Sequence, residues 1–186
     1  CIGLETIHIP ASLERMFMYS FDDSDNYLFE NSLEKEITRI EVDSNNKVYC
    51  SVGGMLFTKD MAKLVYVPNN IHAGNTELVI PECVKIIGSS VFKNCYNLNK
   101  IILPSGLEHI EREAFYGCEN LIEVVWPKKL KTIGDYAFSK VGLRELSLPE
   151  GIEHIKEGVF YGCENLIEVV WPKKLKIIGK YAFSKV

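Results

Sequence analysis

The sequence predicts a β-rich solenoid: a right-handed superhelix of stacked coils, about 23 residues per coil, with a parallel sheet along one face and short helical or 3₁₀ turns elsewhere. Three observations predict this fold class: a recurring proline, a recurring phenylalanine, and apolar columns of the same period. The prolines are spaced by 23, 23, 22 and 23 residues, at Pro81, Pro104, Pro127, Pro149 and Pro172. A phenylalanine follows each proline after eleven residues, at Phe92, Phe115, Phe138, Phe160 and Phe183.

A repeat of this length is typical of leucine-rich repeats, in which each coil is one supersecondary unit. Each coil ends in a segment such as Leu98-x-x-Ile101-x-Leu103-Pro104. The spacing of Ile101 and Leu103 places both side chains on one face of a short strand, and the proline ends that strand because it lacks a backbone donor. Stacked coils then give a parallel sheet of at least five strands. The segment Glu111–Tyr116 is too short for a stable helix, so we expect a single helical or 3₁₀ turn there.

Two further columns describe the expected core. The phenylalanines should form a buried spine, with Phe183 less covered than the others. The cysteine column holds Cys95, Cys118 and Cys163, and valine takes the same position at Val141 and Val186. A position that accepts valine is apolar and buried, so we expect structural thiols. The alternative is a Cys95–Cys118 disulfide between neighbouring coils, because cysteines two coils apart are too distant for one.

The chain is predicted to be one solenoid segment over 1–186, with irregular coils over 1–80 and regular coils over 81–186. The segment from Cys1 to Pro10 matches the segment from Cys95 to Pro104 position by position. The next strand, Ile37-x-x-Ile40-x-Val42, comes ten residues late. We therefore expect an insertion around Asp22–Glu36.

A second insertion, of 15 residues, precedes Pro81. It contains Gly53-Gly54 and two short apolar runs, Met55–Thr58 and Leu64–Val67, separated by Lys59-Asp60. Two apolar runs around a tight polar turn are typical of a β-hairpin. We expect this hairpin to stand off the coil.

The repeat resembles the BspA-like leucine-rich repeats. Ile133-Gly134, Ala137-Phe138 and Gly117-Cys118-x-x-Leu121 fit the pattern of that family, and residues 40–68 look like a variant coil that the family also carries. Glu111 and Lys156 depart from the pattern, because they stand where it has glycine. The resemblance implies a secreted or surface-exposed bacterial protein that acts as an adhesin or binding module, and it implies no catalytic residue.

Both ends are expected to lie inside a longer array. The first residue falls within a repeat, and Val186 stops where Val141 is followed by the start of another strand. Neither end has the polar outer face of a capping repeat. Exposed apolar ends would favour end-to-end self-association. Cys1 could alternatively be a lipidated first residue, but its phase in the repeat favours a structural role.

Composition argues against several classes of function. The formal net charge is −4, and no basic patch suited to nucleic acid or anionic lipid is present in the sequence. No apolar run approaches the ~18 residues of a membrane span. The four histidines are not accompanied by a nucleophile and an orienting group. The acidic run Asp22–Asp25 lacks the glycine and terminal glutamate of a calcium loop and is expected to be a solvated insertion. We therefore expect no enzyme, metal or cofactor.

The candidate binding face is the sheet surface that we expect to be concave. In each strand the residue between the last two core positions points outward, and so does the residue two positions before it. The first of these columns is mostly apolar, and the second is mostly acidic. The first column contains Val79, Ile102, Val125 and Val170, with Ser147 among them, and the second contains Glu77, Lys100, Glu123, Glu145 and Glu168. An exposed apolar stripe beside charge marks interaction sites, although β-branched residues also favour strands for their own sake.

These observations favour a non-enzymatic, surface-displayed binding or adhesion module that engages an extracellular protein or host macromolecule through this sheet face or through the hairpin. Neither nucleic acid nor membrane insertion is expected. The alternative is a structural spacer, in which the repeats present a functional domain outside this segment.

Overall fold

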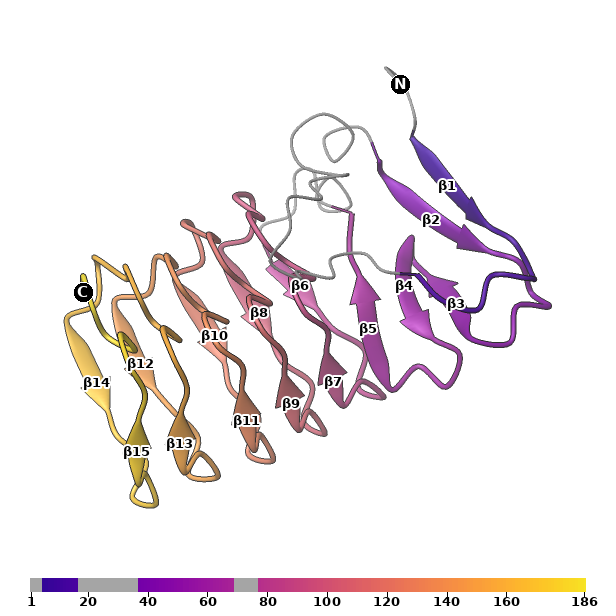
Figure 1. Cartoon of the computed structure of the whole chain (residues 1–186). Helices are drawn as coiled ribbons and strands as arrows, with labels where there is room; N and C mark the ends of the chain where they lie inside the picture. Colours follow the sequence, from indigo (N-terminus) through magenta and orange to yellow (C-terminus); the bar gives the residue numbers. More distant parts are fainter. Residues whose placement is uncertain (1–4, 17–36, 69–76) are drawn as a thin grey trace.

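The computed structural model describes residues 5–16, 37–68 and 77–186, and it confirms a solenoid of stacked coils (Figure 1). Each regular coil carries two short strands joined by turns. Within the described ranges every strand has two to four residues, and no helix is present. The insertion expected around Asp22–Glu36, including the run Asp22–Asp25, lies outside the described residues.

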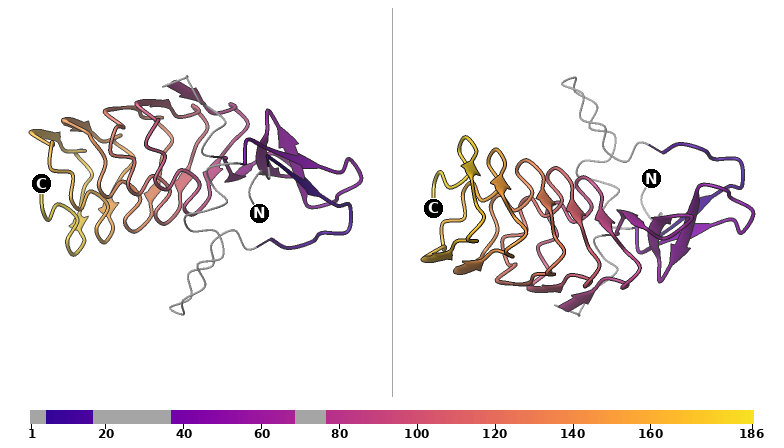
Figure 2. Two further views of the ribbon diagram at one scale, coloured as in Figure 1. Left: turned by 90° about the horizontal axis from the view of Figure 1, so that it is seen from above. Right: turned by 90° about the horizontal axis from the view of Figure 1, so that it is seen from below.

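The strands of the regular coils form two sheet faces, which lie on opposite sides of the coils (Figure 2). The first sheet face consists of the strands before the prolines: β6 (Glu77–Val79), β8 (Lys100–Ile102), β10 (Glu123–Val125), β12 (Glu145–Ser147) and β14 (Glu168–Val170). The second sheet face consists of β7 (Ile86–Ile87), β9 (His109–Ile110), β11 (Thr132–Ile133), β13 (His154–Ile155) and β15 (Ile177–Ile178). Strands that pair within these two faces pair in parallel. The first face was predicted. The second was not, because a two-residue strand carries too little alternation to be recognised.

The helical or 3₁₀ turn expected at Glu111–Tyr116 is wrong. Two backbone N–H groups of this segment bond to carbonyls of the next coil: that of Glu113 donates to Asp135 (3.0 Å) and that of Phe115 donates to Ala137 (2.8 Å). Within the segment, the N–H of Tyr116 donates to the Glu113 carbonyl (3.0 Å), which closes a turn and no helix. Glu113 also has a φ of 54°, in the left-handed region, which no right-handed helix admits. Bonds between coils therefore alternate with turn bonds on the third side of the coils, which carries the turns that follow the strands of the second sheet face.

The predicted phenylalanine spine is confirmed. Phe92, Phe115, Phe138 and Phe160 are buried, and Phe183 is half-buried, as expected. Successive rings stack, with centroid distances of 4.9, 4.8, 6.0 and 5.3 Å along the solenoid. The longest of these distances joins Phe138 to Phe160.

The irregular coils contain the strands β1 to β5. β1 (Thr6–Ile9) and β2 (Arg39–Val42) pair in parallel with Ile7 opposite Ile40, which confirms the repeat phase inferred for the first coils. β3 (Tyr49–Val52), β4 (Met55–Thr58) and β5 (Lys63–Tyr66) follow as an antiparallel meander.

The expected hairpin exists as β4 and β5, but its position off the coil is wrong. β5 pairs in parallel with β7, so the meander extends the second sheet face. Leu56, Phe57 and Leu64 are fully buried. Removing three large apolar side chains from water is more favourable than leaving them on a projecting hairpin, and this explains why the hairpin packs into the solenoid.

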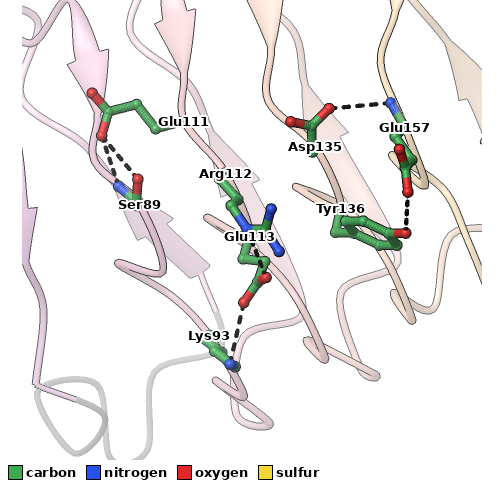
Figure 3. Close-up of polar contacts among 8 residues, drawn as sticks. All are labelled: Ser89, Lys93, Glu111, Arg112, Glu113, Asp135, Tyr136 and Glu157. Atoms are coloured by element: carbon green, nitrogen blue, oxygen red, sulfur yellow. Dashed lines mark hydrogen bonds and ion pairs between the residues drawn. The ribbon is translucent and has the colours of Figure 1, made fainter. Parts of the chain in front are cut away.

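Polar side chains connect neighbouring coils along the turns through hydrogen bonds and ion pairs (Figure 3). The Glu111 carboxylate accepts hydrogen bonds from the backbone N–H (3.0 Å) and hydroxyl (3.1 Å) of Ser89, and it pairs with Lys63 at 2.7 Å. One coil further on, the Asp135 carboxylate accepts from the backbone N–H of Glu157 (3.2 Å). Glu111, which departs from the glycine of the repeat pattern, thus contributes a contact that glycine cannot make.

We expect Glu111→Ala to lower the free energy of unfolding by about 1.5 kcal/mol, because it removes charge-assisted hydrogen bonds in a half-exposed setting. Urea denaturation would measure the loss. Lys156→Ala is the matched control, since Lys156 holds the equivalent position and makes no side-chain hydrogen bond or ion pair to the described residues. Equal losses for the two variants would show that the contacts of Glu111 add nothing to the free energy of unfolding.

The prediction of one sheet with at least five strands is wrong in one respect. On the first face, β6, β8 and β10 form one sheet, and β12 and β14 form another. The second face is interrupted at the same level, between β11 and β13. The third side remains continuous there: the N–H of Tyr136 donates to Glu157, and that of Phe138 to Val159, both at 2.9 Å. The coils therefore separate as a wedge that is hinged on the turn side.

Candidate binding face and the opening within it

The parallel register places the predicted outward residues in two rows on the first sheet face. Ile102 lies opposite Val125, and Lys100 lies opposite Glu123. Beyond the interruption, Ser147 lies opposite Val170 and Glu145 lies opposite Glu168. Val125 and Val170 are 41% and 52% exposed. For Glu77 and Val79 the backbone alone is described, and β6 aligns them with Lys100 and Ile102. The nine residues of the candidate face thus form two groups: six lie on β6, β8 and β10, and three, Glu145, Glu168 and Val170, lie on β12 and β14.

The charges of the acidic row are unevenly compensated. Glu123 pairs with Lys100 at 3.2 Å. Glu145 and Glu168 are exposed, and neither makes an ion pair with the described part of the chain. Because like charges directly opposite each other on neighbouring strands repel, these two carboxylates favour a cation between or above them.

Two exposed isoleucines flank this face and were missed from the sequence. Ile122 and Ile167 precede β10 and β14 and are 59% and 73% exposed. The sequence does contain a signal for them, because Asn99 and Arg144 hold the equivalent position in the other coils. A large apolar residue in an otherwise polar column indicates a position outside the core.

A cavity of about 270 Å³ occupies the interruption between β10 and β12. No Cα atom of β10 lies within 8 Å of a Cα atom of β12, whereas paired strands lie about 4.8 Å apart. Ten residues line the cavity: Ile122, Glu123, Val124, Trp126, Leu143, Glu145, Leu146, Ser147, Glu168 and Val170. All three residues of the second group, together with Glu123, therefore surround a hollow that the sequence did not predict.

A shortened closing segment accounts for the opening. The coil from Pro127 to Pro149 has 22 residues, whereas the others have 23. Where other coils close with a turn, such as Leu121 N–H to Cys118 O at 2.9 Å, residues 141–143 run straight into the next strand. A Cβ on Gly142 would lie 2.3 Å from the Glu119 carbonyl oxygen, so the shortened segment lies tight against the preceding coil. The following strand is consequently displaced from its partner.

A second hollow, of about 500 Å³, lies beside the same short segment and includes Gly142 in its lining. Its two lysines are already engaged. The Lys140 and Lys185 amines lie 5.3 and 5.4 Å from the ring centroids of Tyr116 and Tyr161. The hydrogen bond with Tyr116 raises the pKa of Lys140. Both lysines therefore pack as cations against aromatic rings of the protein itself.

The buried thiols are structural, as predicted. Cys118 and Cys163 are fully buried and donate to the carbonyls of Phe92 (2.9 Å) and Phe138 (3.2 Å). Burial raises the pKa of the Cys163 thiol to about 11, which keeps it protonated and unreactive. No disulfide joins the described cysteines. Among the described residues there is no metal-binding group of histidine, cysteine and carboxylate side chains, and no helix capable of crossing a membrane.

Comparison with known proteins gives a family and a set of solved structures. The family model of the BspA type leucine rich repeat region matches residues 69–186 in six copies. No curated protein matches the chain. The chain resembles a leucine rich cell surface protein from Faecalibacterium prausnitzii, with a TM-score of 0.80 and 24% identity over 98% of this chain and 46% of that one.

It also resembles the pneumococcal vaccine antigen PcpA, with a TM-score of 0.77 and 25% identity over 97% of this chain and 44% of that one. A leucine-rich repeat protein from Eubacterium ventriosum gives a TM-score of 0.62 and 25% identity over 97% of this chain and 58% of that one. The chain thus spans about half the length of these structures.

Proposed function

Because this chain belongs to the BspA-type leucine-rich-repeat family, we propose that it is a non-enzymatic binding module, displayed outside the cell, that holds an extracellular protein or host macromolecule on its first sheet face. Leucine-rich-repeat scaffolds of this kind serve as protein-interaction modules. Surface display is supported by two similar structures, one described as a cell surface protein and the other as a vaccine antigen.

The exposure of the first sheet face carries the proposal. Val125 and Val170 keep about half of their surface in water, and exposed Ile122 and Ile167 stand beside them. Apolar surface rimmed by carboxylates is typical of an interaction site, and stacked coils offer it over an extended length. Such a face suits a protein segment that carries basic residues among apolar ones.

The second candidate function is that of a spacer that presents another domain. The tight stacking of coils, with a continuous phenylalanine spine, favours a rigid support. A spacer, however, gains nothing from exposed isoleucines, which lower solubility. A screen of the chain against extracellular matrix proteins and glycans separates the two functions, since a spacer binds none of them.

We expect two variants to affect a bound partner in different ways. Replacing Glu123, Glu145 and Glu168 by Gln should slow association and flatten its dependence on salt, because rim charges steer encounter. Val125→Asp should speed dissociation, because it places a charge in the apolar contact. Surface plasmon resonance at several salt concentrations would measure both rates.

Circular dichroism should show that both variants remain folded, because these side chains point away from the core. Glu119→Gln, which removes one carboxylate away from this face, serves as the control. A partner that binds both variants with the rates of the unmodified chain would place its site elsewhere.

A further inference from the structure

We propose that the opening between β10 and β12 is a slot that takes up an extended peptide segment of alternating apolar and basic side chains, paired as a strand with both edges. The slot rests on the proposed function and deepens it: it states where on the first sheet face the partner enters and in which conformation. Strand addition of this kind draws affinity from the main chain and specificity from alternate side chains.

The width of the opening fits a missing strand. A strand inserted between two others needs about twice the normal spacing of 4.8 Å between them. The Cα atoms of β10 and β12 are already more than 8 Å apart. Phe138 and Phe160 are also the most widely spaced pair of the spine, at 6.0 Å, so the separation extends into the core. A small further opening about the turn side would complete the fit.

The edge of β10 has backbone groups directed into the slot. The N–H of Glu123 donates to the Asn99 carbonyl (3.3 Å), and the Val125 carbonyl accepts from the N–H of Leu103 (3.2 Å). Residues 123 and 125 therefore face β8. Because backbone groups alternate in direction along a strand of a parallel ladder, the N–H and C=O of Val124 face the opening.

The edge of β12 faces the slot in the same way. The Arg144 carbonyl accepts from the N–H groups of Ile167 (2.8 Å) and Glu168 (3.3 Å), so residue 144 faces β14. By the same alternation, Glu145 and Ser147 direct their N–H and C=O groups toward β10. Within the described chain β10 pairs only with β8 and β12 only with β14. Two strand edges thus face one another with no ladder between them.

The floor of the slot is apolar and solvent reaches it. Val124 and Trp126 are half-buried, although Ile101, which shares the column of Val124, is fully buried. Leu143 and Leu146 line the opposite wall. An inserted strand would cover these side chains with every second residue, which accounts for the apolar half of the alternation.

The mouth of the slot is acidic, which accounts for the basic side chains that alternate with the apolar ones in the proposed peptide. Glu123, Glu145 and Glu168 line the cavity, and of these only Glu123 has a cationic partner among the described residues. A lysine or arginine on the outward face of the inserted strand would lie between Glu123 of β10 and Glu145 of β12, with Glu168 one strand further on. The same carboxylates repel nucleic acid and anionic glycans, which leaves a basic peptide as the occupant.

The test uses the unmodified chain and a fluorescent acetylated peptide of about seven residues with alternating valine and lysine. Three comparison peptides accompany it: one with glutamate for lysine, one with alternate backbone amides methylated, and one with the residue order scrambled. Fluorescence anisotropy gives the Kd, and amide exchange reports protection at Val124, Glu145 and Ser147. Methylation removes donors and should weaken binding at least about tenfold.

The paired variant Glu145→Gln with Glu168→Gln should raise the Kd about fivefold at low salt, as expected for two exposed ion pairs. The control, Glu119→Gln with Glu164→Gln, removes the same charge outside the slot and should leave the Kd unchanged. Ile102→Asp, which alters the sheet face but not the slot, should also leave it unchanged.

The outcomes separate the slot from the proposed function. Absence of peptide binding, or equal binding of the methylated peptide, overturns the slot; the screen against macromolecules then tests the sheet face independently. If Ile102→Asp abolishes peptide binding and the paired variant Glu145→Gln with Glu168→Gln leaves it unchanged, the slot is overturned and the open sheet face is supported as the binding site. A dimer in sedimentation that the peptide cannot dissociate would assign the slot to a second copy of the chain, and the peptide proposal would fail.

Discussion

Phe138→Ala is expected to lower the free energy of unfolding by about 3–5 kcal/mol, the range for a buried phenylalanine truncated to alanine. Phe138 lies 4.8 Å from Phe115 and 6.0 Å from Phe160, and Trp126 packs against it at 5.0 Å. Its loss would leave a cavity that the stiff backbones of three coils cannot fill. Chemical denaturation followed by tryptophan fluorescence would measure the change.

The position of Phe138 should also alter the shape of the unfolding curve. At the level of the opening, neither sheet face pairs across the two coils, so the phenylalanine spine and the turn-side hydrogen bonds carry the coupling. Because the stability of a solenoid is a sum of coil and interface contributions, the variant should unfold in two steps, with residues 145–186 first. Amide exchange resolved by residue would identify the order.

Phe183→Ala is the comparison, since Phe183 occupies the same column and is half-buried. It should cost less than Phe138→Ala and leave a single transition. If the two variants lost equal stability, burial in the spine would not be the source of the effect.

Much of the solenoid could be predicted because stacking makes each coil bury the same positions. The phenylalanine column, the thiol column at Cys118 and Cys163, and the outward rows of the first sheet face all follow from one period. Local rules failed where bonding between coils replaces bonding within a segment. Glu111–Tyr116 has the length of a helical turn, but the N–H groups of Glu113 and Phe115 bond to the next coil.

The opening between β10 and β12 could not be predicted, although its cause was visible in the sequence. A coil of 22 residues among coils of 23 indicates a deletion, and Gly142 stands within it. Whether such a deletion is absorbed in a turn or displaces the next strand depends on close contacts such as that between Gly142 and the Glu119 carbonyl. These contacts depend on distances between coils, which one sequence does not supply.

The second large effect is expected from Asn46→Ala, which should lower the free energy of unfolding by about 3 kcal/mol. Asn46 is fully buried and its side chain makes four hydrogen bonds. The amide nitrogen donates to the carbonyls of Pro10 (2.8 Å) and Leu13 (3.0 Å), and the amide oxygen accepts from the N–H groups of Val48 (2.9 Å) and Tyr49 (2.8 Å).

Alanine would leave these backbone groups without their partner, and each buried polar group left unsatisfied costs about 1–3 kcal/mol, reduced where water can enter. Because Asn46 connects the turn of the first described coil to the β2–β3 segment, the loss should appear as local unfolding of residues 5–16. Amide exchange would show fast exchange there while the regular coils stay protected.

Two further variants identify which half of the amide matters. Asn46→Asp keeps the acceptor for Val48 and Tyr49 but sets a carboxylate against the carbonyls of Pro10 and Leu13, so it should destabilise at least as much as alanine. Asn45→Ala removes an exposed neighbour of the same type and should change stability by less than about 0.5 kcal/mol. A loss for Asn45→Ala as large as that for Asn46→Ala would mean that the effect arises from the turn itself, and the buried amide would then not be the link between the first two coils.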